Sequence, residues 1–160
     1  MSTTSATDSG ILQCIKDETL AMTALATLLK SEQDALVDDN LHTLNEVVAS
    51  KTELVRKINE LERLRLSCLS NAGYEQTADG MEQHLNASPA EARLAWQELL
   101  SISEKAKEFN HTNGLLISRK LSQNQAALGV FQQGSATAAL YGPNGQSSIQ
   151  AMPVKGVIVR

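Results

Sequence analysis

The chain has 160 residues, enough for one domain with a buried core, and only 3% of them are aromatic, which favours an all-α fold over a sheet. Its net charge of −4 is unevenly divided: residues 1–108 carry all 18 acids against 10 bases, whereas residues 109–160 carry four bases and no acid. Four cations over that length are too sparse for a nucleic-acid surface, and no apolar run approaches the roughly 20 residues that cross a bilayer.

The first predicted helix covers about residues 9–36, after residues 1–8, which show no apolar pattern and are expected to be disordered. Residues 1–7 lack the basic and apolar regions of a signal peptide, so we expect a soluble, cytoplasmic protein with no membrane insertion. Within 9–36, apolar residues recur at steps of three and four, as on one face of a helix. They include Leu12, Ile15, Met22, Ala26, Leu29 and Leu36.

A second helix is predicted over about residues 41–71, with a broad apolar face. The run 38–40, Asp-Asp-Asn, breaks the pattern and supplies candidate N-caps. Such a short break favours an antiparallel helical hairpin with the first helix. Gly73 suits the left-handed position just after the second helix, and residues 78–85 of the following linker favour a short helix.

A third long helix is predicted over about residues 88–132. Ser88, Pro89 and Glu91 form a typical start signal, with a capping serine, a proline in the first turn and a capping-box glutamate. At 1.5 Å per residue this helix would be roughly 65 Å long, against roughly 40–45 Å for the other two. One end would therefore lack a helical neighbour if all three pack side by side.

The apolar residues at that end, such as Leu128, Val130 and Phe131, would then lack cover in a monomer and form a candidate partner surface. A break near Gly114 or Gly129, or a weak homodimer, would cover them instead. The predicted fold is an elongated, antiparallel, three-helix, coiled-coil-like bundle over residues 9–132, followed by a flexible tail.

No constellation in the sequence predicts catalysis. His42, His84 and His111 are isolated from one another, and no metal, nucleotide-binding or hydrolase motif is present. Cys14 and Cys68 fall on helices at core spacing, where thiols more often act as small buried hydrophobes than as a disulfide. We therefore expect no enzyme activity, no cofactor and no metal site.

Three asparagines, Asn110, Asn113 and Asn124, occupy positions of the third helix where apolar residues are expected. Buried asparagine can fix helix register and partner choice. Alternatively, these side chains hydrogen-bond to an incoming partner helix. The two interpretations overlap, and the sequence does not separate them.

A compact turn interrupts the C-terminal tail, residues 133–160, which is rich in glycine and has no helical period. The segment 142–145, Gly-Pro-Asn-Gly, fits a type I turn, with proline second, asparagine third and glycine fourth. Leu140 and Tyr141 precede it as a small apolar pair. A specified turn with an aromatic residue predicts a docking element rather than a frayed terminus.

Three segments resemble the FlgN family of flagellar type III export chaperones: residues 110–116 (Asn-His-Thr-Asn-Gly-Leu-Leu), 124–128 (Asn-Gln-Ala-Ala-Leu) and 140–147 (Leu-Tyr-Gly-Pro-Asn-Gly-Gln-Ser). The stretch 51–65 is also similar to this family. The resemblance implies a three-helix cytoplasmic chaperone that binds the two hook-associated, or hook–filament junction, proteins before export. It further implies delivery of this cargo to the export gate of the flagellar type III apparatus.

The resemblance and the helical pattern together give two sets of site residues, with no nucleotide or metal implied. The expected cargo-binding residues are Asn110, Asn113, Gly114, Leu116, Ile117, Leu121, Asn124, Leu128 and Phe131. The expected docking residues are Leu140, Tyr141, Gly142, Pro143 and Gly145. The alternative function is a structural coiled-coil protein that self-assembles, or an adaptor without export cargo.

Overall fold

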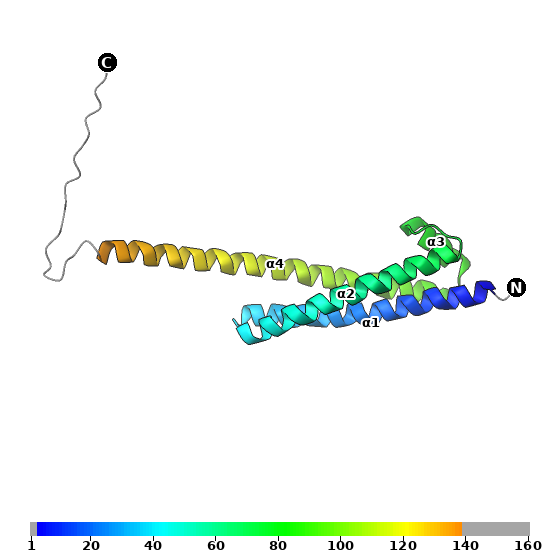
Figure 1. Ribbon diagram of the computed structural model, residues 1–160, viewed down its shortest axis with the longest axis horizontal. Helices are drawn as coiled ribbons and strands as arrows, with labels where there is room; N and C mark the ends of the chain where they lie inside the picture. Colours follow the sequence, from blue (N-terminus) through cyan, green and yellow to red (C-terminus); the bar gives the residue numbers. More distant parts are fainter. Residues whose placement is uncertain (1–2, 139–160) are drawn as a thin grey trace, which may run out of the picture. The chain divides into compact units, whose positions relative to one another are not determined.

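The computed structural model describes the backbone of residues 3–138 and the side chains of residues 10–132. This part of the chain forms four helices and no strand: α1 (Thr3–Val37), α2 (Leu41–Asn71), α3 (Ala78–Ala87) and α4 (Ala90–Ala138). The all-α class is confirmed. The structure divides into a unit of residues 1–117 and a unit of residues 118–160, and each is described by itself. In the first unit, α1 and α2 run side by side, and α3 lies at their end near the N-terminus (Figure 1).

Helix α2 has the bounds that the sequence predicts, but α1 and α4 are longer than predicted. Helix α1 begins at Thr3 rather than near residue 9, and α4 continues to Ala138 rather than ending near residue 132. Both extensions lack an apolar period. The period reports which face of a helix packs, whereas the helix itself needs only continuous backbone hydrogen bonds.

The α1–α2 connection uses the predicted asparagine cap. Asp39 adopts a left-handed conformation with φ of 55°. The backbone N–H of Asn40 donates to the Ala35 carbonyl over 2.9 Å. The Asn40 side-chain oxygen then accepts from the backbone N–H of Thr43 over 3.2 Å. These bonds satisfy backbone groups that a helix end leaves without partners, so the chain reverses within three residues.

Helix α2 ends in a Schellman motif at the predicted glycine. Gly73 has φ of +89°, a conformation that glycine adopts without steric cost. The Tyr74 N–H donates to the Leu69 carbonyl over 3.1 Å, and the Gly73 N–H donates to the Ser70 carbonyl over 2.9 Å. This pair of bonds is the hydrogen-bond pattern of that motif.

Helix α3 depends on a glycine whose role the sequence did not indicate. The Thr77 hydroxyl oxygen caps the helix by accepting from the Gly80 N–H over 3.1 Å. A Cβ atom on residue 80 would lie 2.1 Å from the Glu75 carbonyl oxygen, far inside contact distance. Gly80 therefore lets α3 approach the backbone of the segment that precedes it.

The connection from α3 to α4 differs from the predicted capping box. The Ser88 hydroxyl donates back to the His84 carbonyl over 2.8 Å, at the end of α3, and α4 begins at Ala90. Glu91, the predicted capping-box residue, instead pairs with Lys16 of α1 over 2.7 Å. A tertiary partner has therefore replaced the local one.

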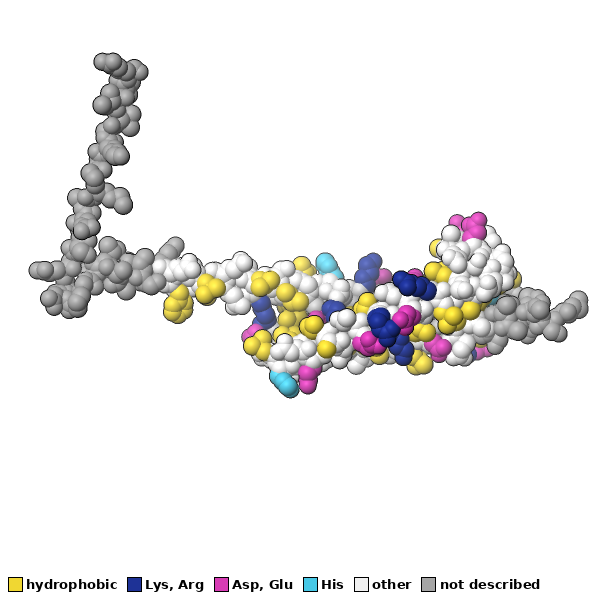
Figure 2. All heavy atoms as spheres, in the orientation of Figure 1, with side chains coloured by type: hydrophobic (Ala, Val, Ile, Leu, Met, Phe, Trp, Pro, Cys, Tyr) yellow, Lys and Arg dark blue, Asp and Glu magenta, His cyan; other side chains and the backbone are white. Residues whose placement is uncertain are grey.

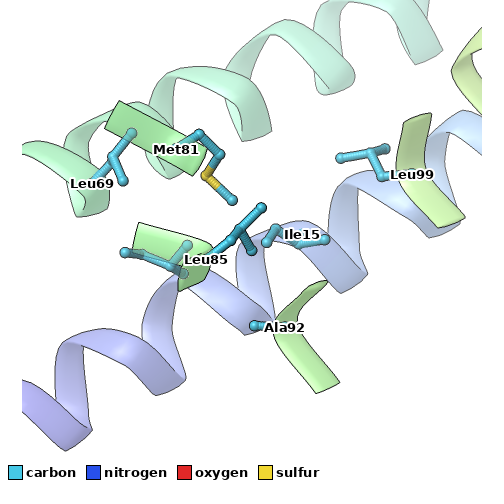
Figure 3. Close-up of a cluster of buried hydrophobic side chains, with 7 residues drawn as sticks. Ile15, Leu69, Met81, Leu85, Ala92 and Leu99 are labelled. Atoms are coloured by element: carbon cyan, nitrogen blue, oxygen red, sulfur yellow. The ribbon is translucent and has the colours of Figure 1, made fainter. Parts of the chain in front are cut away.

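All four helices contribute to the main hydrophobic core (Figure 3). Its buried residues are Ile11, Ile15, Leu69, Met81, Leu85, Ala92 and Leu99. A second cluster farther along the bundle contains Ala26, Leu29 and Ala106. Each large side chain buried in this way contributes about 1.5–3 kcal/mol relative to exposure. The core thus holds α3 and the first part of α4 against the α1–α2 pair.

A buried ion pair crosses the bundle beside the main core. The Arg65 guanidinium of α2 donates to the Glu18 carboxylate of α1 over 2.7 Å, and both side chains are less than a tenth exposed. The same guanidinium lies 4.9 Å from the ring centroid of Trp96 in α4. Burial raises the pKa of Glu18 above its ordinary value, and the Arg65 charge opposes that shift.

A second buried carboxylate joins the same three helices. The Glu32 carboxylate of α1 lies 3.2 Å from the Lys51 amine of α2. The Asn113 side-chain amide of α4 donates to this carboxylate over 2.7 Å and to the Leu29 carbonyl over 2.8 Å. More exposed charged side chains of both signs lie over the face in Figure 2. Ion pairs between exposed side chains contribute little to the stability of the fold.

The two buried carboxylates specify how α1 and α2 align. Glu18 pairs with Arg65 and Glu32 with Lys51, so moving 14 residues forward in α1 moves 14 residues backward in α2. The two helices are therefore antiparallel. A shift of either helix by one residue would separate both charge pairs and leave buried charges uncompensated, which is strongly unfavourable. We infer that the pairs select this register.

Both cysteines are free thiols in the first unit. Cys14 is buried and Cys68 is half-buried beside the main core. Burial, together with the neighbouring Cys68 thiol, raises the pKa of the Cys14 thiol to about 11. The pair therefore packs in the way expected of small hydrophobic residues.

Candidate partner-binding surface

The distal part of α4, residues 118–132, exposes large apolar side chains. Leu121 is 57% exposed, Leu128 is 62% exposed and Phe131 is 80% exposed. Steps of seven and three place these residues on one face of a helix. None of residues 118–132 is buried. An exposed apolar stripe of this kind indicates an interaction surface.

The chemistry of this stripe is apolar with a polar interruption. Asn124 is exposed and lies on the same helix face as Leu121 and Leu128. Arg119 and Lys120 are the charged residues of 118–132, and residues 109–160 contain no acid. The distal part of α4 can therefore receive an amphipathic helix, apolar on one face, without repelling acidic groups at its edges.

The predicted site residues in the first unit have different environments. Asn110 is exposed, Leu116 is half-buried and Ile117 is exposed. A Cβ atom on Gly114 would have no heavy atom within 4 Å, so no close backbone approach exists there. Asn113 is buried, and both hydrogen bonds of its amide nitrogen are internal. The structure thus uses Asn113 to link α4 to α1.

The predicted docking residues lie outside the described part of the chain: Leu140, Tyr141, Gly142, Pro143 and Gly145. The boundary of the predicted tail falls inside α4, because the helix continues to Ala138. The docking role of these five residues stays a prediction from the sequence.

Four large exposed apolar residues of α4 were not among the predicted site residues: Leu94, Leu100, Leu115 and Val130. None of them falls on the stripe of three- and four-residue steps from which the site was predicted. Their apolar character was the signal in the sequence, and it had already grouped Val130 with Leu128 and Phe131 as residues expected to lack cover.

The described residues contain neither a candidate membrane-spanning helix nor a candidate metal site. Residues 3–138 contain no helix that is both long and apolar enough to span a bilayer. Among the side chains of the described residues, no group of three or more histidine, cysteine or acidic residues is placed to hold a metal ion.

Three curated relatives share the name "Flagella synthesis protein FlgN". The protein from Proteus mirabilis is 25% identical over 128 residues, which cover 79% of this chain and 82% of the relative. Two proteins from Yersinia enterocolitica, one from a serotype O:8 strain, are 26% and 27% identical over 126 residues, covering 78% of this chain and 80% of each relative. No solved structure gives a significant match.

The family comparison covers more of the chain than these relatives do. The FlgN protein family model matches residues 1–149, which include all four helices and the segment predicted to dock. On this match, the chain belongs to the FlgN family.

Proposed function

We propose that this protein acts in flagellum biogenesis as a cytoplasmic export chaperone. Its cargo would be the hook-associated proteins, whose terminal helices it would cover before export. It would then deliver them to the export gate of the flagellar type III apparatus. Membership of the FlgN family supports the flagellar role, as do its relatives, which are named flagella synthesis proteins.

The observation that carries the proposal is the exposed apolar face of α4 formed by Leu121, Leu128 and Phe131. A chaperone for amphipathic helices needs such a face, because the apolar stripe of the cargo must be removed from water to prevent its self-association. The predicted flexible tail would gain order on binding, and this ordering would lower the net affinity and favour later release.

The predicted turn beyond α4 gives the proposal a second element. Tyr141 and its neighbours would dock to the export gate or to the cargo. Their position just after the proposed cargo surface in sequence would couple loading to delivery. Replacing Tyr141 by alanine should weaken export while leaving the helical circular dichroism signal unchanged; normal export by this variant would remove the turn from the mechanism.

We also retain the prediction that α1, α2 and α4 pack as an antiparallel coiled-coil-like bundle. The spacing of the Glu18–Arg65 and Glu32–Lys51 ion pairs supports it, since 14 residues equal two heptads on both α1 and α2. The bundle would then serve as a stable base, and the distal part of α4 would carry the cargo.

The test compares two substitutions on the same helix. Leu128→Asp places a charge on the proposed surface, and Leu94→Asp is the matched control, because Leu94 is 65% exposed and lies in the first unit. Titration calorimetry with each hook-associated protein should show that Leu128→Asp weakens binding at least about tenfold, which equals about 1.4 kcal/mol. Leu94→Asp should bind as the natural chain does.

Two results would count against the proposal. Unchanged affinity of Leu128→Asp would remove the distal face from cargo binding. A natural chain that binds neither hook-associated protein, and instead forms large assemblies by light scattering, would favour the alternative of a self-assembling coiled-coil protein. A stable monomer that forms stoichiometric complexes supports the chaperone.

A further inference from the structure

A groove runs along the first unit between α2 and α4, with α1 as its floor. Two hollows of about 260 Å³ and about 250 Å³ share Met22 and Ser103 in their linings, so they lie next to each other along this seam. We call this feature the α2–α4 groove. It lies entirely within residues 18–110 and is separate from the distal part of α4.

In the hollow lined by Lys51 and Lys107, both walls lack large buried side chains, whereas the buried Leu99 of α4 and Arg65 of α2 line the other hollow. On α2, no residue between Val47 and Arg65 is buried, although this stretch contains several apolar residues. On α4, Ser103 and Ala106 face the groove with small side chains. A three-helix bundle with walls of this kind leaves room for a fourth element along the seam.

The dimensions of the groove fit a helix of four turns. Its α4 wall extends from Trp96 to Asn110, which corresponds to about 21 Å at 1.5 Å per residue. Met22, Leu25 and Leu29 supply an apolar floor. A helix satisfies its own backbone hydrogen bonds, whereas an extended segment would bury unsatisfied N–H and C=O groups against this floor. A helix of about 14 residues is therefore the suitable occupant.

Charge complementarity selects the kind of helix. One hollow is lined by two lysines, Lys51 and Lys107, and by no acidic residue. In the other hollow, Glu18 and Glu62 both pair with Arg65. Lys51 lies against the buried Glu32 carboxylate. Lys107 is exposed and has no ion pair with any described residue. An occupant that carries a carboxylate near Lys107 would be favoured, and one that carries only basic residues would be repelled.

This criterion argues against occupants from the chain's own C-terminal part. Residues 109–160 contain four basic residues and no acid, so neither the tail nor the distal part of α4 from a second copy can supply a carboxylate side chain. We propose that the α2–α4 groove binds an acidic amphipathic helix of a partner protein, as the fourth helix of the bundle. This binding site is additional to the distal surface.

The single tryptophan, Trp96, lines one end of the groove and serves as the reporter. The full chain is titrated with two synthetic 14-residue amphipathic helical peptides that lack tryptophan. Both carry a leucine stripe, and they differ by glutamate or lysine at the positions facing Lys107. The acidic peptide should shift the Trp96 emission and bind about tenfold more tightly than the basic peptide, and this preference should weaken at high salt.

Matched variants locate the binding. Lys107→Glu should reverse the peptide preference, whereas Lys105→Glu, an exposed lysine outside the lining, should leave it unchanged. Val55→Lys should weaken both peptides about tenfold by placing a charge on the groove wall. Val48→Lys is its control, because Val48 is exposed on the same helix and is absent from the lining. Circular dichroism confirms that each variant is folded.

The outcomes separate this proposal from the proposed function. The proposal that the α2–α4 groove binds an acidic helix would be overturned if both peptides bind equally well. It would also be overturned if the acidic peptide is still preferred by Lys107→Glu. The absence of peptide binding, together with a dimer that Val55→Lys dissociates, would show that a second copy occupies the groove and would also overturn it. Failure of both hook-associated proteins to bind would contradict the chaperone but would leave the peptide result standing.

Discussion

The proximal and distal parts of α4 carry similar apolar patterns in very different environments. In residues 90–117, Leu99 and Ala106 are buried against α1. In residues 118–132, Leu121 and Leu128 fall at comparable helical steps and are exposed. The comparison teaches that an apolar stripe identifies the face of a helix that needs a partner. Whether the partner is the chain itself or another protein depends on tertiary packing.

Polar contacts distinguish the two parts as clearly as apolar ones. The proximal part is joined to α1 by the buried Asn113 amide, and Trp96 stacks with the Arg65 guanidinium. The distal part has no acidic residue, so it cannot form an ion pair between its own side chains. The proximal part therefore has one specified position in the bundle, and the distal part keeps a surface available for a partner.

The largest expected effect on stability comes from the core of the first unit. Leu29→Ala removes a side chain that is 1% exposed in the second cluster. Deleting it should lower the free energy of unfolding by about 2–5 kcal/mol, because a cavity remains beside α4. Urea denaturation followed by circular dichroism measures the change. A loss below about 0.5 kcal/mol would contradict the packing of this cluster.

A smaller loss is expected at the close approach between α3 and the segment before it. Gly80→Ala would place a methyl group 2.1 Å from the Glu75 carbonyl oxygen. The strain should lower the free energy of unfolding by about 1–3 kcal/mol and increase hydrogen exchange within α3. Gly114→Ala is the matched control, since the same methyl group has open space there.

At Gly114, replacement of glycine by alanine should stabilise the fold, whereas at Gly80 it should destabilise it. Gly114→Ala should raise the free energy of unfolding by up to about 1 kcal/mol, because alanine has the higher helix propensity and meets no steric conflict. Thermal denaturation of the variant measures this gain. A loss of stability, or a loss of partner binding, would mean that a backbone approaches Gly114 closely in a state not described by this structure.

The buried Glu18 carboxyl should give the first unit a measurable pH dependence. Its pKa in the folded protein is raised from the ordinary value of 4.5, mainly by burial. The folded state therefore binds this proton more tightly than the unfolded state. The contribution of Glu18 to stability is full below pH 4.5 and is lost as the pH rises through the folded-state pKa.

Comparison with Glu18→Gln isolates this contribution. The free energy of unfolding of the natural chain minus that of the variant should decrease as the pH rises above 4.5, because glutamine does not titrate. Denaturation at a series of pH values provides both curves. A difference that stays constant or grows with pH would show that Arg65 outweighs burial.

The smallest expected effect on stability falls on the distal face. Leu128→Ala makes the same chemical change as Leu29→Ala, but the side chain is largely exposed. The free energy of unfolding should change by less than about 0.5 kcal/mol. Affinity for a hook-associated protein should nevertheless fall. Equal losses of stability and affinity would identify Leu128 as an ordinary core residue.

Local signals in the sequence account for the parts of the fold that were predicted well. The bounds of α2 follow from Asn40 before it and Gly73 after it, whose conformations depend on neighbouring residues. Gly80 and Glu91 depend instead on contacts with Glu75 and Lys16, which the local sequence does not reveal. The sequence therefore predicts the ends of α2, which local caps specify, better than it predicts tertiary contacts or the start of α1 and the end of α4.

The candidate site follows the same division. The helical period correctly grouped Leu121, Leu128 and Phe131 on one face, because period depends only on helix geometry. The period also grouped Asn113 with them, although the structure buries its amide against Glu32 and Leu29. The α2–α4 groove was not predicted, because it arises from side-chain sizes on three helices that pack together.

Hydrogen exchange with mass spectrometry tests the central claim, that the distal part of α4 is the cargo surface. Without cargo, the amides of residues 118–132 should exchange quickly, since no residue there is buried. With a hook-associated protein bound, exchange in this segment should slow markedly, while that around the core residues Leu69 and Leu85 should stay unchanged. Unchanged exchange in residues 118–132 within a stable complex would contradict the account.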